Sequence, residues 1–308
     1  MVTRLYTHPI FQEHITPPGH PERPDRLRAI ERALDDQAFE ALDRVEAPAG
    51  DEATILYAHP AEFVARVRAL IPETGIVRID GDTTASPKSW QAAVTAIGAA
   101  NSGVDDVFEA RADNVFVAAR PPGHHAEKTT SMGFCLFNTA AIAARYAQKK
   151  HGAERVAIVD WDVHHGNGTQ DIFWDDPSVL YCSTHQMPLY PGTGAKSETG
   201  AGNIVNAPLS PRTGSDVFRD AFLSRVLPAL DNFAPDLIIV SAGFDAHHRD
   251  PLAEINLVED DFDWATGQLM ERAQRHSGGR LVSLLEGGYD LHGLAFSVAA
   301  HVGRLMKG

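Results

Sequence analysis

Short apolar segments rich in β-branched residues alternate with longer amphipathic segments along this chain. Most of the apolar segments contain almost no polar residue, which suits strands that are buried on both faces of a parallel sheet. The expected strands are Val2–His8, Asn114–Ala119, Val156–Asp160, Val179–Thr184, Leu237–Ser241 and Leu281–Leu285. The expected helices are roughly Glu22–Leu34, Ala61–Leu70, Lys88–Arg111, Thr139–Lys149, Ser215–Leu230, Glu259–His276 and Leu291–Met306. This alternation predicts an α/β fold with a doubly wound, mostly parallel sheet, whose ligands bind beyond the carboxyl ends of the strands.

The composition limits both the number of domains and the kinds of partner. No repeat or long linker divides the 308 residues, so we expect a single domain over 1–308. The 27 Lys and Arg residues against 41 Asp and Glu residues give a net charge of −14, which argues against direct binding to nucleic acid or an anionic membrane. No apolar stretch approaches the roughly 20 residues that span a bilayer, and the N-terminus does not resemble a signal peptide. Because 2 cysteines cannot build a disulfide framework, a cytoplasmic location is expected.

Four of the expected strands are followed by glycine-rich turns that carry ionisable side chains. The turns are Arg120-Pro-Pro-Gly-His124-His125, Trp161-Asp162-Val-His164-His165-Gly-Asn167-Gly, Ala242-Gly-Phe-Asp245-Ala-His247-His248 and Glu286-Gly-Gly-Tyr289. The carboxyl ends of parallel strands lie at one edge of a sheet, so we expect these side chains to converge there.

The spacing of Asp160, Asp162 and His164 indicates a metal site. Residues two apart in an extended segment point the same way, so Asp162 and His164 can both face one divalent ion, with Asp160 one step deeper. Asp245 ends another apolar strand, where an unpaired carboxylate would be costly to bury, and it is the candidate third ligand. The alternatives are a buried Asp–His ion pair for the first motif and a helix or turn cap for Asp245. Three protein ligands with one open position are typical of catalytic zinc.

The other two turns supply candidates for acid–base chemistry. His124 and His125 follow a buried strand and a rigid Pro-Pro pair, and Asp160 and Asn167 are available to fix their tautomers. The phenol of Tyr289 can donate a hydrogen bond to a developing oxyanion. Taken singly, two such histidines are more often independent surface residues, and a tyrosine after a strand more often serves only in packing. Two carboxylate ligands would offset much of the charge of a divalent ion, so a nearby base is needed to take the proton of a water molecule.

Together these motifs resemble the zinc-dependent histone deacetylase family, which includes bacterial deacetylase-like amidohydrolases and acetylpolyamine amidohydrolases and shares the arginase–deacetylase fold. The resemblance also rests on His20-Pro-Glu-Arg-Pro-Asp-Arg26, Gly133-Phe-Cys-Leu-Phe-Asn138 and Tyr190-Pro-Gly-Thr-Gly194, and it covers almost the whole chain in the family's order. Asn167, where one branch of the family has Asp, makes the chain look more like the class II and bacterial branch.

The resemblance implies metal sites. It implies one zinc ion per chain on Asp162, His164 and Asp245, although this Asp₂His set is hard enough to leave ferrous iron open. It also implies potassium. The nearer monovalent-cation site would use Asp160, Asp162, His164, Ser183 and Thr184, and a weaker second candidate would use Phe173, Asp176 and Val179.

The resemblance further implies roles for the remaining site residues. His124, bonded to Asp160, would be the inner histidine; His125, oriented by Asn167, would be the general base and then acid; and Tyr289 would polarise the substrate carbonyl. The substrate tunnel would be bounded by Gly133, by Phe134 and Tyr190 facing each other, and by Leu252 near the rim, with Arg26 in an internal pocket beneath the metal. The expected reaction is hydrolysis of an N-acetylated amine to acetate and the free amine.

The sequence argues against two other functions and leaves the substrate open. A two-metal ureohydrolase of the arginase type needs a second carboxylate two residues after Asp245, where this chain has His247. A non-catalytic binding module would have no need for His125 and Tyr289. Acetyl-lysine is the expected substrate class, and acetylpolyamines or small acyl amides are the alternatives. Asp80 and Asp82 could meet a polyamine's distant ammonium at the tunnel mouth, or could be solvated turn residues. The oligomeric state is open, a homo-oligomer included.

Overall fold

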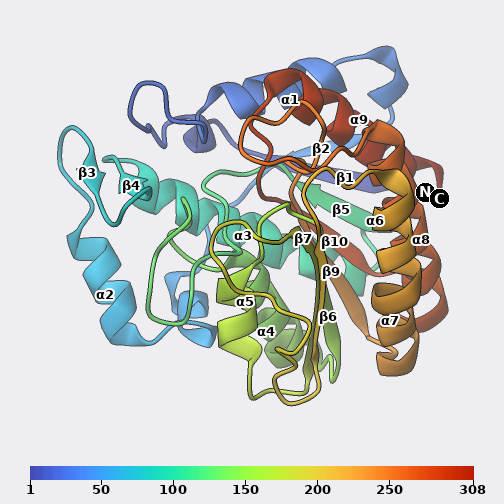
Figure 1. The fold of residues 1–308 in the computed structure, drawn as a ribbon. Helices are drawn as coiled ribbons and strands as arrows, with labels where there is room; N and C mark the ends of the chain where they lie inside the picture. The colour runs from blue at the N-terminus through green and yellow to red at the C-terminus, as the bar shows by residue number, and fades with distance from the viewer.

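The computed structural model describes residues 1–308, and its centre is one eight-stranded sheet (Figure 1). The strands of the sheet are β1 (Thr3–Thr7), β2 (Asp43–Glu46), β5 (Asn114–Val117), β6 (Val156–Asp160), β7 (Val179–Gln186), β8 (Ile204–Leu209), β9 (Leu237–Ala242) and β10 (Leu281–Leu285). Their order is β2-β1-β5-β10-β9-β6-β7-β8, and every neighbouring pair is parallel. The expected doubly wound α/β fold is therefore confirmed.

Helices cover both faces of the sheet. The α-helices are α1 (Asp25–Leu34), α2 (Ala61–Ala69), α3 (Ser89–Phe108), α4 (Thr139–His151), α5 (Asn167–Phe173), α6 (Ser215–Ala221), α7 (Leu227–Phe233), α8 (Glu259–His276) and α9 (Leu291–Lys307). In Figure 1, α3, α4 and α5 lie on one side of the sheet, and α1, α9, α8 and α7 lie on the other. None of these helices combines the length and the apolar character needed to cross a bilayer.

The central strands are buried on both faces, as their composition predicts. Every residue of β6, β7, β9 and β10 is buried, and the apolar side chains belong to one continuous core. The six expected strands are all present, and their ends differ from the expected ones by at most two residues. Burial on both faces explains why these segments lack the alternation of a half-exposed strand.

Two strands of the sheet were not expected from the sequence. The edge strand β2 has the sequence Asp-Arg-Val-Glu and alternates between half-buried and exposed positions, so it lacks an apolar run. The opposite edge strand, β8, contains Asn206 and Pro208, and a proline is tolerated there because one side of an edge strand has no partner to bond. A short antiparallel hairpin of β3 (Val77–Arg78) and β4 (Thr84–Ala85) was also not predicted from the sequence.

The helix expected over Ser215–Leu230 is interrupted in the structure. A π-helical turn at Phe222–Val226 separates α6 from α7, which continues to Phe233. Pro228 lies in the first turn of α7 and has no N–H to donate to the preceding turn, so the regular i→i−4 hydrogen-bond ladder cannot run through this point. The short helix α5, immediately after the Trp161–Gly168 turn, was not expected either.

The strand order brings the four ionisable turns together. β10 lies between β5 and β9, and β9 lies beside β6, so the carboxyl ends of these four strands are adjacent. The registers align Leu284 with Val117 and with Ser241, and Ser241 with Asp160, so the four strands end at nearly the same height. The turns that follow them therefore meet at one edge of the sheet.

Candidate active site

Asp162, His164 and Asp245 form a buried cluster at the carboxyl edge of the sheet. Nδ1 of His164 lies 3.2 Å from Oδ1 of Asp162 and 3.2 Å from Oδ2 of Asp245. The first two residues follow β6, and Asp245 follows β9, so two neighbouring strands supply the three donor atoms.

The donor atoms fit a zinc ion. The other carboxylate oxygens are already engaged, because Asp162 Oδ2 accepts from Gly287 N at 2.8 Å and Asp245 Oδ1 accepts from Val163 N at 2.8 Å. These bonds leave one oxygen of each aspartate turned toward His164. Ligands about 2.0–2.2 Å from a tetrahedral zinc ion lie roughly 3.3–3.6 Å from one another, close to the spacing of this cluster. The cluster can therefore hold one ion with three protein ligands and leave a coordination position open.

The electrostatics of the cluster also indicate a cation. Burial lowers the pKa of His164, but its hydrogen bonds to Asp162 and Asp245 outweigh that effect and raise the pKa to about 10. Burial, reinforced by the charge of Asp162, raises the pKa of Asp245 to about 7. Two carboxylates buried this close together repel each other, and a divalent ion between them would relieve the repulsion.

His124 lies beside the cluster and is paired with the carboxylates of Asp160 and Asp162. Its Nδ1 is 3.0 Å from Oδ2 of Asp160, and its Nε2 is 3.8 Å from Oδ1 of Asp162. Burial lowers the pKa of His124, but the charges of Asp162 and Asp160 outweigh it and hold the pKa well above the ordinary value. Asp160 also accepts a hydrogen bond from the hydroxyl of Tyr181. The buried carboxylates around His124 therefore favour its charged form.

His125 differs from its neighbour in both charge and partner. Its Nδ1 lies 2.8 Å from the amide oxygen of Asn167, and the Asn167 amide nitrogen donates to Glu127 at 2.8 Å. Because an amide oxygen can only accept, Nδ1 of His125 carries the proton and Nε2 keeps its lone pair. Burial, with the positive charges of His124 and His164, holds the pKa of His125 well below the ordinary value. This neutral imidazole can accept a proton at Nε2.

Gly133 packs directly on the ring of His125. A Cβ at this position would lie 2.3 Å from Cδ2 of His125, and the backbone has a φ of +56°, so both space and conformation require glycine. The β3–β4 loop fixes this segment, because Gly133 N donates to Asp82 Oδ1 at 3.1 Å and Phe134 N donates to Thr83 Oγ1 at 3.0 Å.

Several aromatic rings pack against the residues of the site. The centroid of Phe134 lies 5.8 Å from that of Tyr289 and 4.8 Å from that of His20. Tyr190, which is 39% exposed, packs edge-on to His125 with centroids 5.1 Å apart. The two aromatic residues expected to face each other thus each pack against a different ring of the site.

Tyr289 is held by a contact of its ring with Arg26 and by a backbone hydrogen bond to Asp250. The guanidinium of the fully buried Arg26 lies 5.0 Å from the centre of the Tyr289 ring. Tyr289 N donates to Asp250 Oδ2 at 2.7 Å, and Asp250 Oδ1 accepts from Leu252 N at 3.0 Å. Asp250 therefore links the loop of Leu252 to the turn of Tyr289.

Comparison with known proteins identifies the chain's relatives. A model of the histone deacetylase domain matches residues 20–305. The chain belongs to the histone deacetylase family. A histone deacetylase-like amidohydrolase of Pseudomonas aeruginosa is 41% identical over 88% of this chain and 73% of its own length. A probable deacetylase of Archaeoglobus fulgidus is 37% identical over 95% of this chain and 83% of its own length.

A solved structure matches the fold closely. The crystal structure of the HDA15 HD domain superimposes with a TM-score of 0.94 at 38% identity, over 99% of this chain and 89% of that one. These matches confirm the resemblance drawn from the motifs. This histone deacetylase family member is a hydrolytic deacetylase, and zinc dependence is the norm of its family.

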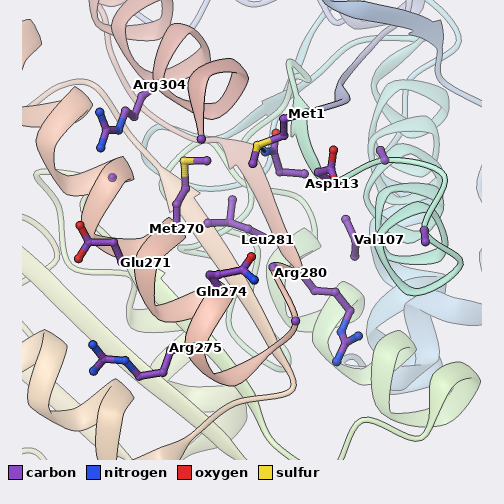
Figure 2. Close-up of a pocket in the computed structure, with 17 residues that line it drawn as sticks. Met1, Val107, Asp113, Met270, Glu271, Gln274, Arg275, Arg280, Leu281 and Arg304 are labelled. Carbon is purple, nitrogen blue, oxygen red and sulfur yellow. Dashed lines mark hydrogen bonds between the residues drawn. The ribbon is translucent and has the colours of Figure 1, made fainter.

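Two other features of this deacetylase lie away from the cluster. Asp105, Glu109 and His151 bring ligand atoms within 4.8 Å, but His151 Nε2 already lies 2.6 Å from Asp105 Oδ1 and Glu109 pairs with Arg111. A cavity of about 630 Å³ opens at the opposite edge of the sheet, beside the first residues of β5 and β10 (Figure 2). None of the expected site residues lines that cavity.

Some contacts of the deacetylase site were not foreseen from the sequence. Glu286 was noted only as part of a turn, yet its buried carboxylate accepts from Gly123 N and His124 N. A carboxylate at the end of a buried, mostly apolar strand needs buried partners, and that signal could have marked it. His247, in the turn after β9, is buried and lies against Gly293.

Proposed function

We propose that this deacetylase hydrolyses the amide of an acetyl-lysine-like substrate, with His125 as the general base. The observation that carries the proposal is the orientation of His125. Asn167 holds the proton on its Nδ1, so the unprotonated Nε2 is the free nitrogen of a ring that packs near the metal cluster. A base in this tautomer can take a proton from an attacking water molecule and later give it to the leaving amine.

The neighbouring residues complete the proposed chemistry. Asp162, His164 and Asp245 would hold zinc, which when bound would supply Lewis-acid polarisation of the substrate carbonyl. The positive charge of His124, kept by Asp160, would stabilise negative charge that develops beside it. The phenol of Tyr289 would donate to the carbonyl oxygen as that oxygen becomes negative. Gly133, Phe134, Tyr190 and Leu252 would contact the slim apolar stem that carries the acyl amide.

An acetylpolyamine substrate is the second candidate, and Asp82 favours it. This half-buried carboxylate reaches the segment of Gly133 and Phe134. Burial, together with the charge of Asp80, raises the pKa of Asp82. A cationic substrate group at the rim would stabilise its ionised form. Asp80 instead caps its own turn, accepting from Asp82 N and Thr83 N, as a turn residue would.

We also propose a potassium ion beside the cluster, on Asp160, Asp162, His164, Ser183 and Thr184. The register of β6 with β7 aligns Asp160 with Ser183, which supports their common use. The hydroxyl of Thr184 is buried and has no hydrogen-bond partner in the protein. An oxygen-preferring cation could use such a group.

Metal content and turnover, measured on the same samples, test this proposal. We expect one zinc ion per chain, loss of activity on chelation and recovery with zinc or cobalt, since the ion has only three protein ligands. Asp245→Ala should lose the ion, whereas His151→Ala, in the second acidic cluster, should keep it. A panel of acetyl-lysine peptides, acetylpolyamines and small acyl amides should give the highest kcat/KM for the peptides. Full activity in protein shown to be metal-free would contradict the mechanism.

A further inference from the structure

Glu286 lies at the point where β10 ends and the turn of Tyr289 begins, and it is 1% exposed. Its backbone is held on both sides, because its N–H donates to Ala242 O at 3.0 Å and its carbonyl accepts from Arg26 Nη2 at 2.5 Å. The backbone of Glu286 is therefore held by β9 and by a buried arginine.

The carboxylate of Glu286 reaches across to a different turn. Oε2 accepts from Gly123 N at 2.7 Å and from His124 N at 3.2 Å, and neither N–H donates to a backbone carbonyl. Both donors belong to the turn after β5, which carries His124 and His125. One side-chain oxygen thus supplies the hydrogen bonds that this turn cannot make with its own backbone.

The turn that contains Glu286 also touches the other parts of the site. Gly287 N donates to Asp162 Oδ2 at 2.8 Å, and Gly288 O accepts from Arg26 Nε at 2.6 Å. Tyr289 follows directly. The histidine turn, the metal cluster and the tyrosine are consequently joined through residues 286–289, and Glu286 is the member whose side chain contacts the histidine turn.

We propose that Glu286 is a positioning residue that fixes the His124–His125 turn relative to Tyr289. The inference rests on the function proposed for His125 and Tyr289. Glu286 itself does not touch the reacting atoms; it acts through the backbone of the histidine turn. Its reach, from the end of β10 to two N–H groups, is the property that matters, because misplacing a catalytic group by about 1 Å can cost on the order of 10²-fold in rate.

Two variants of Glu286 separate the effect of its side-chain length from the effect of its charge. Glu286→Gln keeps the length of the side chain and an oxygen that can accept both N–H groups, but it removes the charge. Glu286→Asp keeps the charge, but it is shorter by one methylene and cannot span the same gap. We expect kcat within about threefold of the parent for Gln and a loss of roughly 10-fold to 10²-fold for Asp, with KM and metal content unchanged in both.

A remote carboxylate provides the control for stability. Asp261 is also fully buried, and its Oδ2 accepts from Val258 N at 3.1 Å and from Ser215 Oγ at 2.7 Å. Asp261→Asn should lower the melting temperature and leave kcat per metal-loaded chain unchanged. Equal kcat values for the Gln and Asp variants of Glu286, or a larger loss for Gln, would overturn the positioning role.

NMR spectroscopy tests the positioning role of Glu286 without measuring turnover. His124 Nδ1 lies 3.0 Å from Asp160 and His125 Nδ1 lies 2.8 Å from Asn167, so their N–H protons should give slowly exchanging downfield NMR signals in the zinc-loaded protein. Glu286→Asp should shift or broaden both signals, and Glu286→Gln should leave them in place. Unchanged signals in the Asp variant would refute the proposal. An inactive parent protein whose signals respond as expected would instead refute only the proposed function.

Discussion

The phenol of Tyr289 has no hydrogen-bond partner within the protein, although its ring is fixed by Phe134 and Arg26. Burial raises the pKa of Tyr289 well above the ordinary value, so the hydroxyl stays protonated and can donate near neutral pH. Tyr289→Phe should lower kcat by about 10²–10³, the range for losing one oxyanion donor, because it deletes only that donor. KM and metal content should change little.

A packing role for Tyr289 leads to the opposite result. Phenylalanine would preserve the contacts with Phe134 and Arg26, so a residue that serves only in packing would leave kcat within about twofold of the parent, far from the loss expected for an oxyanion donor. Steady-state kinetics on this one variant, with metal content measured beside them, distinguish the two roles.

Metal content also separates the roles of His125 and His164. His125→Ala should keep the ion and lose turnover by roughly 10²–10⁴, as expected for a general base. His164→Ala should lose both, because its Nδ1 is one of the three clustered donor atoms. Rate alone cannot separate these cases. Loss of zinc from the His125 variant would show that the two roles are assigned wrongly.

The site residues that could be predicted are those with a signature in local sequence. Asp162 and His164 stand two residues apart after an apolar strand, so their common direction follows from strand geometry. Glu286 and Asp82 could not be placed in the same way. Their partners, Gly123 N and Gly133 N, are 163 and 51 residues away along the chain, and the bonds depend on strand order and on a loop conformation.

The segment of Gly133 shows how an element positions a catalytic group. Gly133→Ala should lower kcat by on the order of 10²-fold, because the new methyl group would displace the ring of His125, a collision that a shift of about 1 Å can only partly relieve. The metal cluster is not touched by this change, so zinc content should be retained. Kinetics and metal analysis of the variant provide the check.

Gly75 offers a matched control for Gly133. Its φ of +72° imposes a similar backbone strain on alanine, but a Cβ there would meet nothing within 4 Å. Gly75→Ala should therefore reproduce the cost of the strain and keep normal turnover. Similar kinetics for both alanine variants would mean that contact with His125 does not explain the glycine.

At the scale of elements, the central strands could be predicted because they are buried on both faces. The edge strands β2 and β8 could not be predicted in this way. β6 and β10 are entirely apolar except for one polar residue each, whereas β2 and β8 carry charged residues, an asparagine and a proline. An edge strand has one unpaired side and needs less apolar surface, so its sequence resembles a loop.

Across the whole molecule, four buried histidines outside the metal cluster have pKa values far below the ordinary one. Burial is the main cause, and it lowers the pKa of His59 and His185 to about 4 and the pKa of His165 and His301 to about 3. The ordinary value is about 6.5. Below that pH the unfolded chain binds protons that the folded chain rejects. Stability from these groups is therefore present above about pH 6.5 and is lost as the pH falls toward the folded-state values.

His301 isolates this effect from the active site. It is fully buried, its Nδ1 lies 2.6 Å from Thr266 Oγ1 and its Nε2 lies 2.9 Å from Ser283 Oγ. From pH 7.5 to pH 5, one such histidine should remove about 2 kcal/mol from the free energy of unfolding. Glutamine can bond the same two hydroxyls and does not titrate, so His301→Gln should lose about 2 kcal/mol less than the parent protein over this range.

Urea unfolding of the zinc-loaded parent and His301→Gln at both pH values measures that difference. The comparison cancels the contribution of His124, whose raised pKa acts in the opposite sense, and any release of metal in acid, because both proteins share them. The variant's stability at pH 7.5 serves as its own reference. A packing defect alone would lower the free energy of unfolding by the same amount at both pH values. Parallel losses in the two proteins would mean that His301 takes up its proton as readily in the folded chain as in the unfolded one.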